Sequence, residues 1–282
     1  MSKSLFVTGC NGFIGKNLVH YFLARKWKVL GLSRLEPNFC SKNFTWIKGE
    51  LSNFNLEKKN IDYCVHTAGI SPRHSSNPLD FLKNNTLGTK CLLDKLTKTN
   101  CKGLIFLSGV SVYGKVKDKF VDENTNFNKP NDYGLSKIFS EIILKSQTNI
   151  PSCILRLPGV IGKNSTSPWL CKQIINISKN NDILIYNPES LFNNIVYIND
   201  LNDFILKMIR ERICVFNKTF VLGGHEKIKV FDLIKFLIKN FNSSSNIIIN
   251  NSNTNSFYIN DNNARKYGYI SSSIENIVND FF

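Results

Sequence analysis

The sequence contains no hydrophobic run close to the roughly 20 residues that a membrane-spanning helix needs, although 42% of its 282 residues are hydrophobic. It therefore predicts no membrane partner, and the hydrophobic content suffices for a sizeable core. The apolar patch at the N-terminus is interrupted by Gly9, Gly12 and Gly15, and no small-residue cleavage site follows. We expect a buried strand there instead of a signal peptide, and a cytoplasmic location.

No Cys-x-x-Cys pair occurs among the eight cysteines, most of which sit inside apolar runs. In a chain without an export signal, this pattern predicts reduced thiols in the core and gives no support for disulfides or a metal site. The cysteines are Cys10, Cys40, Cys64, Cys91, Cys101, Cys153, Cys171 and Cys214.

Acidic residues are scarce, with 21 Asp and Glu against 36 Lys and Arg and a net charge of +15. Such an excess can indicate nucleic acid, a membrane surface or an anionic small substrate as partner. No five basic residues follow one another, and Asn, Lys, Ile and Phe are abundant throughout. We therefore interpret the charge mainly as a compositional bias and do not expect nucleic acid as the partner.

The first half of the sequence alternates short apolar or β-branched runs with longer amphipathic segments. Strands are predicted at residues 5–7, 29–32, 45–47, 63–66, 104–107 and 152–155. Helical patterns lie at residues 15–25, 81–96 and 136–145. The alternation predicts an α/β fold with a doubly wound parallel sheet, which binds ligands beyond the carboxyl ends of its strands.

The pattern becomes irregular after residue 157. Helical stretches at 169–178, 200–210 and 231–241 are separated by extended pieces at 183–186, 195–198 and 219–222. Residues 242–256 form a polar segment around a short strand at 247–249. We expect a large domain over residues 1–157, to which later segments return, and a mainly small α+β substrate domain over residues 158–282.

A glycine-rich loop follows the first predicted strand and precedes a helical pattern. Gly9 permits a tight turn, Gly12 lets the backbone approach a pyrophosphate, and Gly15 lets helix and strand pack closely. The free N–H groups of the helix N-terminus add partial positive charge. These features predict a Rossmann-type dinucleotide site. Its predicted contacts are Gly9, Asn11, Gly12, Phe13, Ile14 and Gly15.

The end of the second predicted strand lacks the acidic residue that typically binds the ribose hydroxyls of NAD. Ser33 and Arg34 stand there instead. A carboxylate would repel a 2′-phosphate, whereas Ser and Arg can donate hydrogen bonds to it. The sequence therefore favours NADP(H) over NAD(H) as the cofactor.

Tyr133 and Lys137 lie four residues apart at the start of a predicted amphipathic helix, so both occupy one helical face. A nearby ammonium and a positive nicotinamide would lower the pKa of the phenol toward working pH. We predict that Tyr133 exchanges the proton that accompanies hydride transfer.

With these motifs on one chain, the sequence resembles an extended short-chain dehydrogenase/reductase of the NAD-dependent epimerase/dehydratase family, which acts mainly on nucleotide sugars. The similarity spans nearly the whole chain. The matching segments are residues 8–15, 50–51, 66–69, 85–89, 107–114, 133–137, 155–162 and 192–200.

The resemblance implies further roles for residues of these segments. Glu50 and Leu51 would lie by the adenine, and Ala68 and Gly69 by the ribose and pyrophosphate. Lys137 would hold the nicotinamide ribose. Asn85 and, near the carboxamide, Pro158 complete the implied cofactor set. The implied substrate contacts are Ser71, Arg73, Asn164, Trp169, Asn193 and Asn194.

One position departs from the family pattern. The family's catalytic Ser or Thr lies five residues before the Gly of a Tyr-Gly motif, and Gly109 occupies that position here. Ser108 and Ser111 flank it, and Ser111 could face the same side if the segment were extended. We take both serines as catalytic candidates. The alternatives are that Tyr133 works without a hydroxyl partner or that catalysis is lost.

Residues 110–111 of the same segment help to decide which reaction of the family to expect. Val110 and Ser111 stand where the resemblance would place the acidic pair of a dehydratase, so dehydration is not expected. An exchangeable NADPH suits a reductase of a nucleotide-linked keto sugar, our leading hypothesis. The alternatives are an epimerase with bound NAD and a non-catalytic NADP-binding or redox-sensing protein. By analogy with the family, residues 81–96 and 136–145 could pair two copies into a homodimer.

Overall fold

The structure is a computed structural model that describes residues 3–57, 59–147, 149–163, 165, 168–225, 227–250 and 256–281. It divides into two compact units whose segments alternate along the chain. Unit 1 comprises residues 1–114, 130–156 and 202–220, and unit 2 comprises residues 115–129, 157–201 and 221–282.

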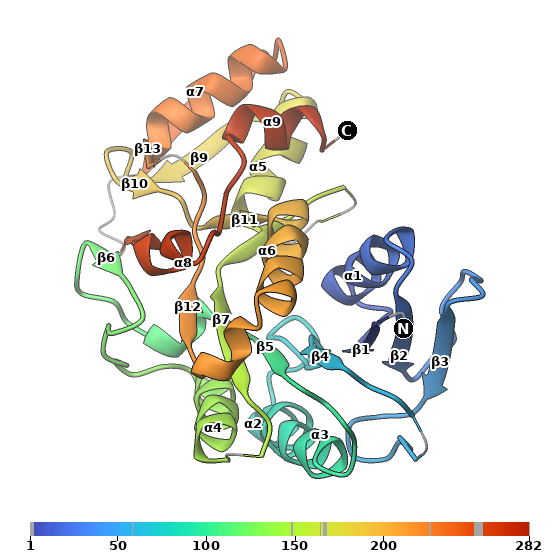
Figure 1. Ribbon diagram of the computed structural model, residues 1–282. Helices are drawn as coiled ribbons and strands as arrows, with labels where there is room; N and C mark the ends of the chain where they lie inside the picture. The colour runs from blue at the N-terminus through green and yellow to red at the C-terminus, as the bar shows by residue number, and fades with distance from the viewer. Residues whose placement is uncertain are drawn as a thin grey trace. The chain divides into compact units, whose positions relative to one another are not determined.

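A seven-stranded sheet forms the centre of unit 1, in the order β12-β7-β5-β4-β1-β2-β3 (Figure 1). The pairings of β1 with β2 and β4, of β2 with β3 and of β4 with β5 are parallel. The strands are β1 (Ser4–Thr8), β2 (Lys28–Ser33), β3 (Phe44–Lys48), β4 (Tyr63–His66), β5 (Leu104–Gly109), β7 (Ser152–Leu157) and β12 (Thr219–Val221).

Helices cover both faces of this sheet. Helix α1 and residues 202–210 of α6 lie on one side, and α2, α3 and α4 lie on the other (Figure 1). Every residue of β1, β4 and β5 is buried, which is why these strands are continuous apolar runs in the sequence. The helical segments are α1 (Phe13–Ala24), α2 (Pro78–Phe81), the π-helix η1 (Leu82–Leu87), α3 (Gly88–Leu96), the 3₁₀ turn η2 (Val110–Tyr113), α4 (Asp132–Ser146), α6 (Ile198–Arg210) and the 3₁₀ turn η3 (Ile213–Phe216).

The strand order reverses between β1 and β4. From β1 the chain continues to β2 and β3 on one side, then crosses to β4 and β5 on the other. In open α/β sheets, ligands bind beyond the carboxyl ends of the strands at such a point. The fold therefore directs attention to the loops after Thr8 and His66.

Unit 2 is built from short two-stranded sheets and helices. Parallel pairs form between β11 and β8, β14 and β9, and β15 and β6, and an antiparallel pair forms between β10 and β13. Its elements are β6 (Phe120–Val121), β8 (Gly159–Ile161), α5 (Trp169–Ser178), β9 (Ile183–Tyr186), β10 (Leu191–Phe192), β11 (Ile195–Tyr197), β13 (Ile228–Lys229), α7 (Val230–Asn240), β14 (Ile247–Asn250), β15 (Tyr258–Ile259), α8 (Asn262–Lys266) and α9 (Ile274–Asn279).

The predicted α/β fold is confirmed, and all six strands predicted in the first half belong to the large sheet. The helical pattern at residues 81–96 is confirmed, and its first part, η1, is a π-helical segment between α2 and α3. The extended piece expected at 219–222 forms β12 at the edge of the large sheet. Within the polar stretch at 242–256, residues 251–255 lie outside the described residues.

The cysteines are free thiols, and six are buried, as the apolar runs around them predicted. Within the described residues, no helix combines the length and the apolar character needed to cross a membrane.

Candidate active site

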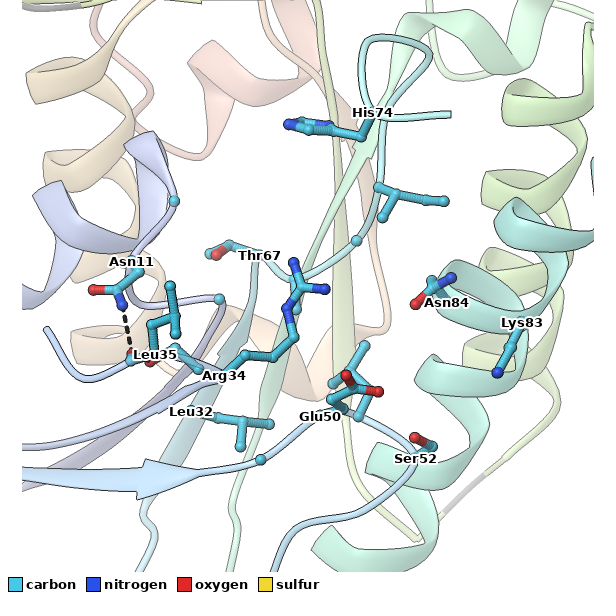
Figure 2. Close-up of a pocket in the computed structure, with 18 residues that line it drawn as sticks. Asn11, Leu32, Arg34, Leu35, Glu50, Ser52, Thr67, His74, Lys83 and Asn84 are labelled. Carbon is cyan, nitrogen blue, oxygen red and sulfur yellow. Dashed lines mark hydrogen bonds between the residues drawn. The ribbon is translucent and has the colours of Figure 1, made fainter. Parts of the chain in front are cut away.

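A pocket of about 340 Å³ lies at the carboxyl ends of β1, β2, β3 and β4 (Figure 2). Unit 1 supplies all of its walls. The lining residues are Gly9, Asn11, Gly12, Leu32, Ser33, Arg34, Leu35, Gly49, Glu50, Leu51, Ser52, Thr67, Ala68, Gly69, Ile70, His74, Lys83 and Asn84. The pocket thus occupies the position that the strand order indicates for a ligand.

The glycine loop has the geometry that its sequence predicts. Gly9 has a φ of 70°, in the left-handed region that side chains disfavour. A Cβ atom on Gly15 would lie 2.2 Å from the carbonyl oxygen of Gly9, so only glycine allows α1 to approach β1 this closely. A Cβ on Gly12 would meet only that same oxygen, at 3.3 Å. Gly12 therefore keeps the pocket side of the loop open.

The N-terminus of α1 is suited to an anion. Gly12 is the N-cap and provides no capping side chain, and the first turn holds no acidic residue. The N–H groups of this turn, which includes Phe13 and Ile14, have no helical partners of their own. Together with the open backbone at Gly12, they form a cradle of the kind that binds a pyrophosphate.

The predicted role of Ser33 as a donor to a 2′-phosphate does not fit the structure. Its hydroxyl donates to the carbonyl of Leu35 at 2.7 Å. It also accepts from the indole N–H of Trp46 at 3.1 Å and from the thiol of Cys10 at 3.3 Å. A hydroxyl has one donor and two acceptor positions, so Ser33 is fully used within the protein.

Arg34 remains as the cation at this end of the pocket. Its exposed side chain extends from the end of β2 into the pocket (Figure 2). Asn11 lies beside it and donates to the carbonyl of Leu35 at 2.6 Å. Selection of a 2′-phosphate by Arg34 therefore stays a prediction.

The opposite walls come from the loops after β3 and β4 and from η1. Glu50 and Leu51, the residues implied for the adenine, line the pocket, as do Ala68 and Gly69. Lys83, Asn84 and His74 also line it, although the sequence analysis did not identify them. Lys83 and Asn84 lie in the π-helix, where the side chains face other directions than in a regular α-helix. The α-helical spacing of the sequence therefore gave no indication that they face the pocket.

Asn85 acts as a link between the pocket wall and α4. It is 2% exposed, and its side chain binds both the N–H and the carbonyl of Ile70, at 2.8 and 3.1 Å. Its amide also donates to the hydroxyl of Ser136 at 3.0 Å. Asn85 thereby fixes the loop that contains Gly69 against the helix that contains Lys137.

Tyr133 and Lys137 lie in the first turns of α4, as predicted. Asn131 caps this helix by accepting from the N–H of Gly134, and Asp132 stabilises the first turn. The ammonium of Lys137 donates to the carbonyl of Leu107 at 3.0 Å and lies 5.9 Å from the centroid of the Tyr133 ring.

The lowering of the Tyr133 pKa by a bound nicotinamide stays a prediction. Burial raises the pKa of Tyr133, because the surroundings disfavour the phenolate. Burial also lowers the pKa of Lys137 to about 8, against the raising influence of Glu141. Without a bound cofactor, burial thus disfavours the charged forms of both groups.

The pair adjoins the pocket. Gly69 lines the pocket, and a Cβ atom on it would lie 3.7 Å from the Nζ atom of Lys137. Lys137 thus lies next to the Gly69 wall of the pocket.

The two candidate serines differ in their surroundings. Ser108 donates to the buried carboxylate of Glu141 at 2.6 Å, so its hydroxyl is committed to the core. The hydroxyl oxygen of Ser111 is buried and has no hydrogen-bond partner within the described residues. A Cβ on Gly134 would lie 2.4 Å from the Ser111 carbonyl oxygen, which puts Ser111 next to the Tyr133 turn.

The expected extended backbone around Ser111 is wrong. Strand β5 ends at Gly109, and Val110–Tyr113 form a 3₁₀ turn. Alternation along a strand therefore cannot explain where Ser111 points, and its position follows from the packing of η2 against Gly134.

The implied substrate residues fall in both units. Ser71 and Arg73 follow β4 in unit 1, and the Ser71 hydroxyl pairs with His74 at 3.0 Å. Asn164 lies outside the described residues. The others, Trp169, Asn193 and Asn194, belong to unit 2, as does Pro158 of the implied cofactor set.

Asn193 has a structural task in unit 2. It is 1% exposed, and its amide binds both the N–H and the carbonyl of Ile259, at 2.7 and 2.9 Å. It therefore holds β15 and is a poor substrate contact. Asn194 keeps a buried side-chain oxygen without a partner among the described residues. The Trp169 ring packs on Phe192 with a centroid distance of 5.1 Å.

The chain is similar in sequence to a known family and to several of its members. Residues 5–223 match the sequence model of the NAD dependent epimerase/dehydratase family. A GDP-6-deoxy-D-talose 4-dehydrogenase from Aggregatibacter actinomycetemcomitans is 28% identical, over 82% of this chain and 78% of the relative. A putative UDP-glucose 4-epimerase from Methanocaldococcus jannaschii is 30% identical, over 82% of this chain and 81% of the relative.

The fold also matches that of a solved structure. The UDP-glucuronic acid 4-epimerase from Bacillus cereus, in complex with NAD, superposes with a TM-score of 0.84 at 20% identity. The match covers 99% of this chain and 97% of that chain.

Gly15 and Gly12 provide a matched pair of substitutions. Gly15→Ala places a methyl group against backbone, and we expect it to reduce the free energy of unfolding by about 1–3 kcal/mol. Gly12→Ala meets no such obstacle, but its methyl group stands where a pyrophosphate would approach. We expect it to leave stability nearly unchanged and to weaken dinucleotide binding at least tenfold, roughly. Urea unfolding and titration calorimetry with NAD and NADPH measure the two effects, and equal losses of stability would contradict this assignment.

Proposed function

The chain belongs to the NAD-dependent epimerase/dehydratase family, and on this premise we propose that it is an enzyme that epimerises a nucleotide-linked sugar with a nicotinamide dinucleotide. One observation carries the proposal. The ammonium of Lys137 lies at the Gly69 wall of the glycine-loop pocket, so a dinucleotide bound there would end at the Tyr133 and Lys137 pair.

The residues of the pocket fit such a cofactor. The uncapped N-terminus of α1 and the backbone at Gly12 suit a pyrophosphate. Lys137 would hold the nicotinamide ribose, as the family resemblance implies. When bound, a nicotinamide ring accepts or returns the hydride of a sugar C–H bond.

Tyr133 would move the proton that accompanies the hydride. A bound nicotinamide and the Lys137 ammonium would favour its phenolate against the effect of burial. As the sugar carbon is oxidised, the phenolate oxygen would take the proton of the sugar hydroxyl, and it would return the proton when the carbonyl is reduced from the opposite face. Over one cycle the hydride and the proton that leave the sugar both return to it, so an epimerase consumes no cofactor. Ser111 is proposed to hydrogen-bond the same sugar oxygen, because its buried hydroxyl has no partner within the described residues.

The epimerase proposal is supported by the relatives. The relative at 30% identity bears the name of a UDP-glucose 4-epimerase and aligns over most of both chains. We therefore favour epimerisation over the keto-sugar reductase that the sequence alone predicted. UDP-linked hexoses are the first substrates to test.

A keto-sugar reductase is the second candidate, and two observations favour it. Burial raises the pKa of Tyr133, and a phenol that keeps its proton is suited to protonate a carbonyl oxygen. Arg34 extends into the pocket, and a cation there suits the 2′-phosphate of NADPH. The relative named as a GDP-6-deoxy-D-talose 4-dehydrogenase also fits this candidate.

We further propose that two copies pair through the outer face of α4 and its neighbours. Leu135, Phe139 and Ile142 follow one face of α4 and are 39%, 49% and 53% exposed. Leu79 and Leu87 of the adjoining segments are 68% and 53% exposed. An apolar stripe of this kind suits a helix-to-helix interface between identical subunits.

The reaction is tested with the purified protein and UDP-glucose or UDP-galactose, without added cofactor. An epimerase interconverts the two sugars, which proton NMR detects. Tyr133→Phe should lower the rate by about 10²–10⁴-fold, because the proton-transfer group is lost. Net oxidation of added NADPH with a 4-keto sugar nucleotide would instead identify the reductase. Cofactor binding without turnover in either assay would refute both enzymes.

Cofactor preference is tested by comparing Arg34→Ala with Ser33→Ala. Loss of the charged fork should weaken NADPH binding about 10–100-fold and leave NADH binding nearly unchanged. Ser33→Ala should change the two affinities equally, because its hydroxyl is used by the protein. A preference for NADPH that survives in Arg34→Ala would exclude Arg34 as its source.

The dimer is tested with Phe139→Asp, which places a charge in the centre of the proposed interface. Sedimentation equilibrium should show a dimer for the wild type and a monomer for the variant. Leu184→Asp is the control, because Leu184 is 44% exposed on β9 and lies outside the stripe. A wild-type monomer would refute the interface.

A further inference from the structure

Unit 1 contains a buried ion pair that the proposed chemistry does not use. Arg156 of β7 and Glu141 of α4 have side chains that are each 3% exposed. The guanidinium donates to both carboxylate oxygens, at 3.1 and 2.8 Å. Lys145 lies at the edge of the pair, 4.0 Å from Glu141.

The pair holds both ends of the turn that bears Ser111. At one end, the Ser108 hydroxyl donates to Glu141 at 2.6 Å. At the other end, the Arg156 guanidinium donates to the hydroxyl of Tyr113 at 3.2 Å and lies over its ring, 5.1 Å from the centroid.

Stability alone is a weak reason for such a pair. Removing two charges from water is expensive, and apolar residues of similar size often stabilise a core equally well. A buried ion pair is easier to explain if it fixes the position of neighbouring segments of the chain. Here it connects β5, η2, α4 and β7, and its contacts to Ser108 and Tyr113 lie on either side of Ser111 in the sequence.

The same pair acts on Lys137, one helical turn before Glu141. Burial favours the neutral amine of Lys137, and Glu141 opposes this by raising its pKa. The other groups that face Lys137 are Tyr133 on α4, the carbonyl of Leu107 on β5 and His66 on β4. His66 is neutral, since burial and Lys137 lower its pKa to about 3.

We propose that Glu141 and Arg156 are positioning residues that fix the Ser111 turn against Tyr133 and keep the ammonium of Lys137 in place. This inference rests on the proposed function of the same site. It explains how the chain holds a hydroxyl beside Tyr133 although Gly109 occupies the position where the family resemblance expects one.

Ser108→Ala is the first variant, because it removes one anchor and leaves the ion pair intact. We expect kcat to fall about tenfold, while KM for the sugar and the affinity for the cofactor stay unchanged. Ser108→Thr keeps the hydroxyl and should restore the rate. Lys207→Ala with Glu211→Ala is the matched control, because it removes an exposed ion pair of α6.

Glu141→Leu with Arg156→Met is the second variant, which replaces both charges together and so leaves no unpaired charge in the core. The midpoint of Lys137, followed by NMR of its Nζ atom, should fall below the wild-type value, because the raising influence of Glu141 is lost. The high-pH limit of activity should move in the same direction, because Lys137 acts as an ammonium. Ser108→Ala should leave both midpoints unchanged.

The kcat of Ser108→Ala and the Lys137 midpoint of the double variant distinguish a failure of the proposed function from a failure of this inference. If the wild type acts on no nucleotide sugar, the proposed function fails, and the Lys137 midpoint still tests the pair. An unchanged midpoint in the folded double variant would overturn the inference. A Ser108→Ala protein that loses thermal stability but keeps its kcat would likewise show that the pair has only a structural role.

Discussion

The close approach of helix α1 to strand β1 is the constraint on which the site depends. With a Cβ position on Gly15 only 2.2 Å from the Gly9 carbonyl, no other residue could stand there without moving the helix. The approach points the free N–H groups of α1 at the reversal point between β1 and β4. The loops after β2, β3 and β4 then complete a pocket around that point.

A second constraint acts at the other end of the pocket, where the chemistry needs polar groups inside a core. Lys137 and Asn85 are 6% and 2% exposed, and each is held by specific partners. Asn85 connects the Gly69 loop to α4, and the Leu107 carbonyl binds the Lys137 ammonium. The proposed reactive groups are thus positioned by backbone atoms and buried side chains of three different elements, which limits their movement.

Several residues with suggestive chemistry have structural tasks instead. Ser33 is saturated by Trp46, Cys10 and Leu35, and Ser108 is bound to Glu141. Asn193 is used by the backbone of Ile259. In each case the residue type matched the expected function, but a hydrogen-bond donor or acceptor is available to a ligand only if the protein does not already occupy it.

The sequence by itself determined the α/β class, the strand positions, the glycine loop and the helix that bears Tyr133 and Lys137. These features follow from local rules: the period of apolar residues, the conformations open to glycine, and the four-residue spacing along a helix. The tertiary structure alone decided the π-helix that brings Lys83 to the pocket, the 3₁₀ turn at Ser111 and the raised pKa of Tyr133. Each depends on atoms far away in the sequence, because burial and competing hydrogen bonds are properties of packed surroundings and are not encoded within a short window of residues.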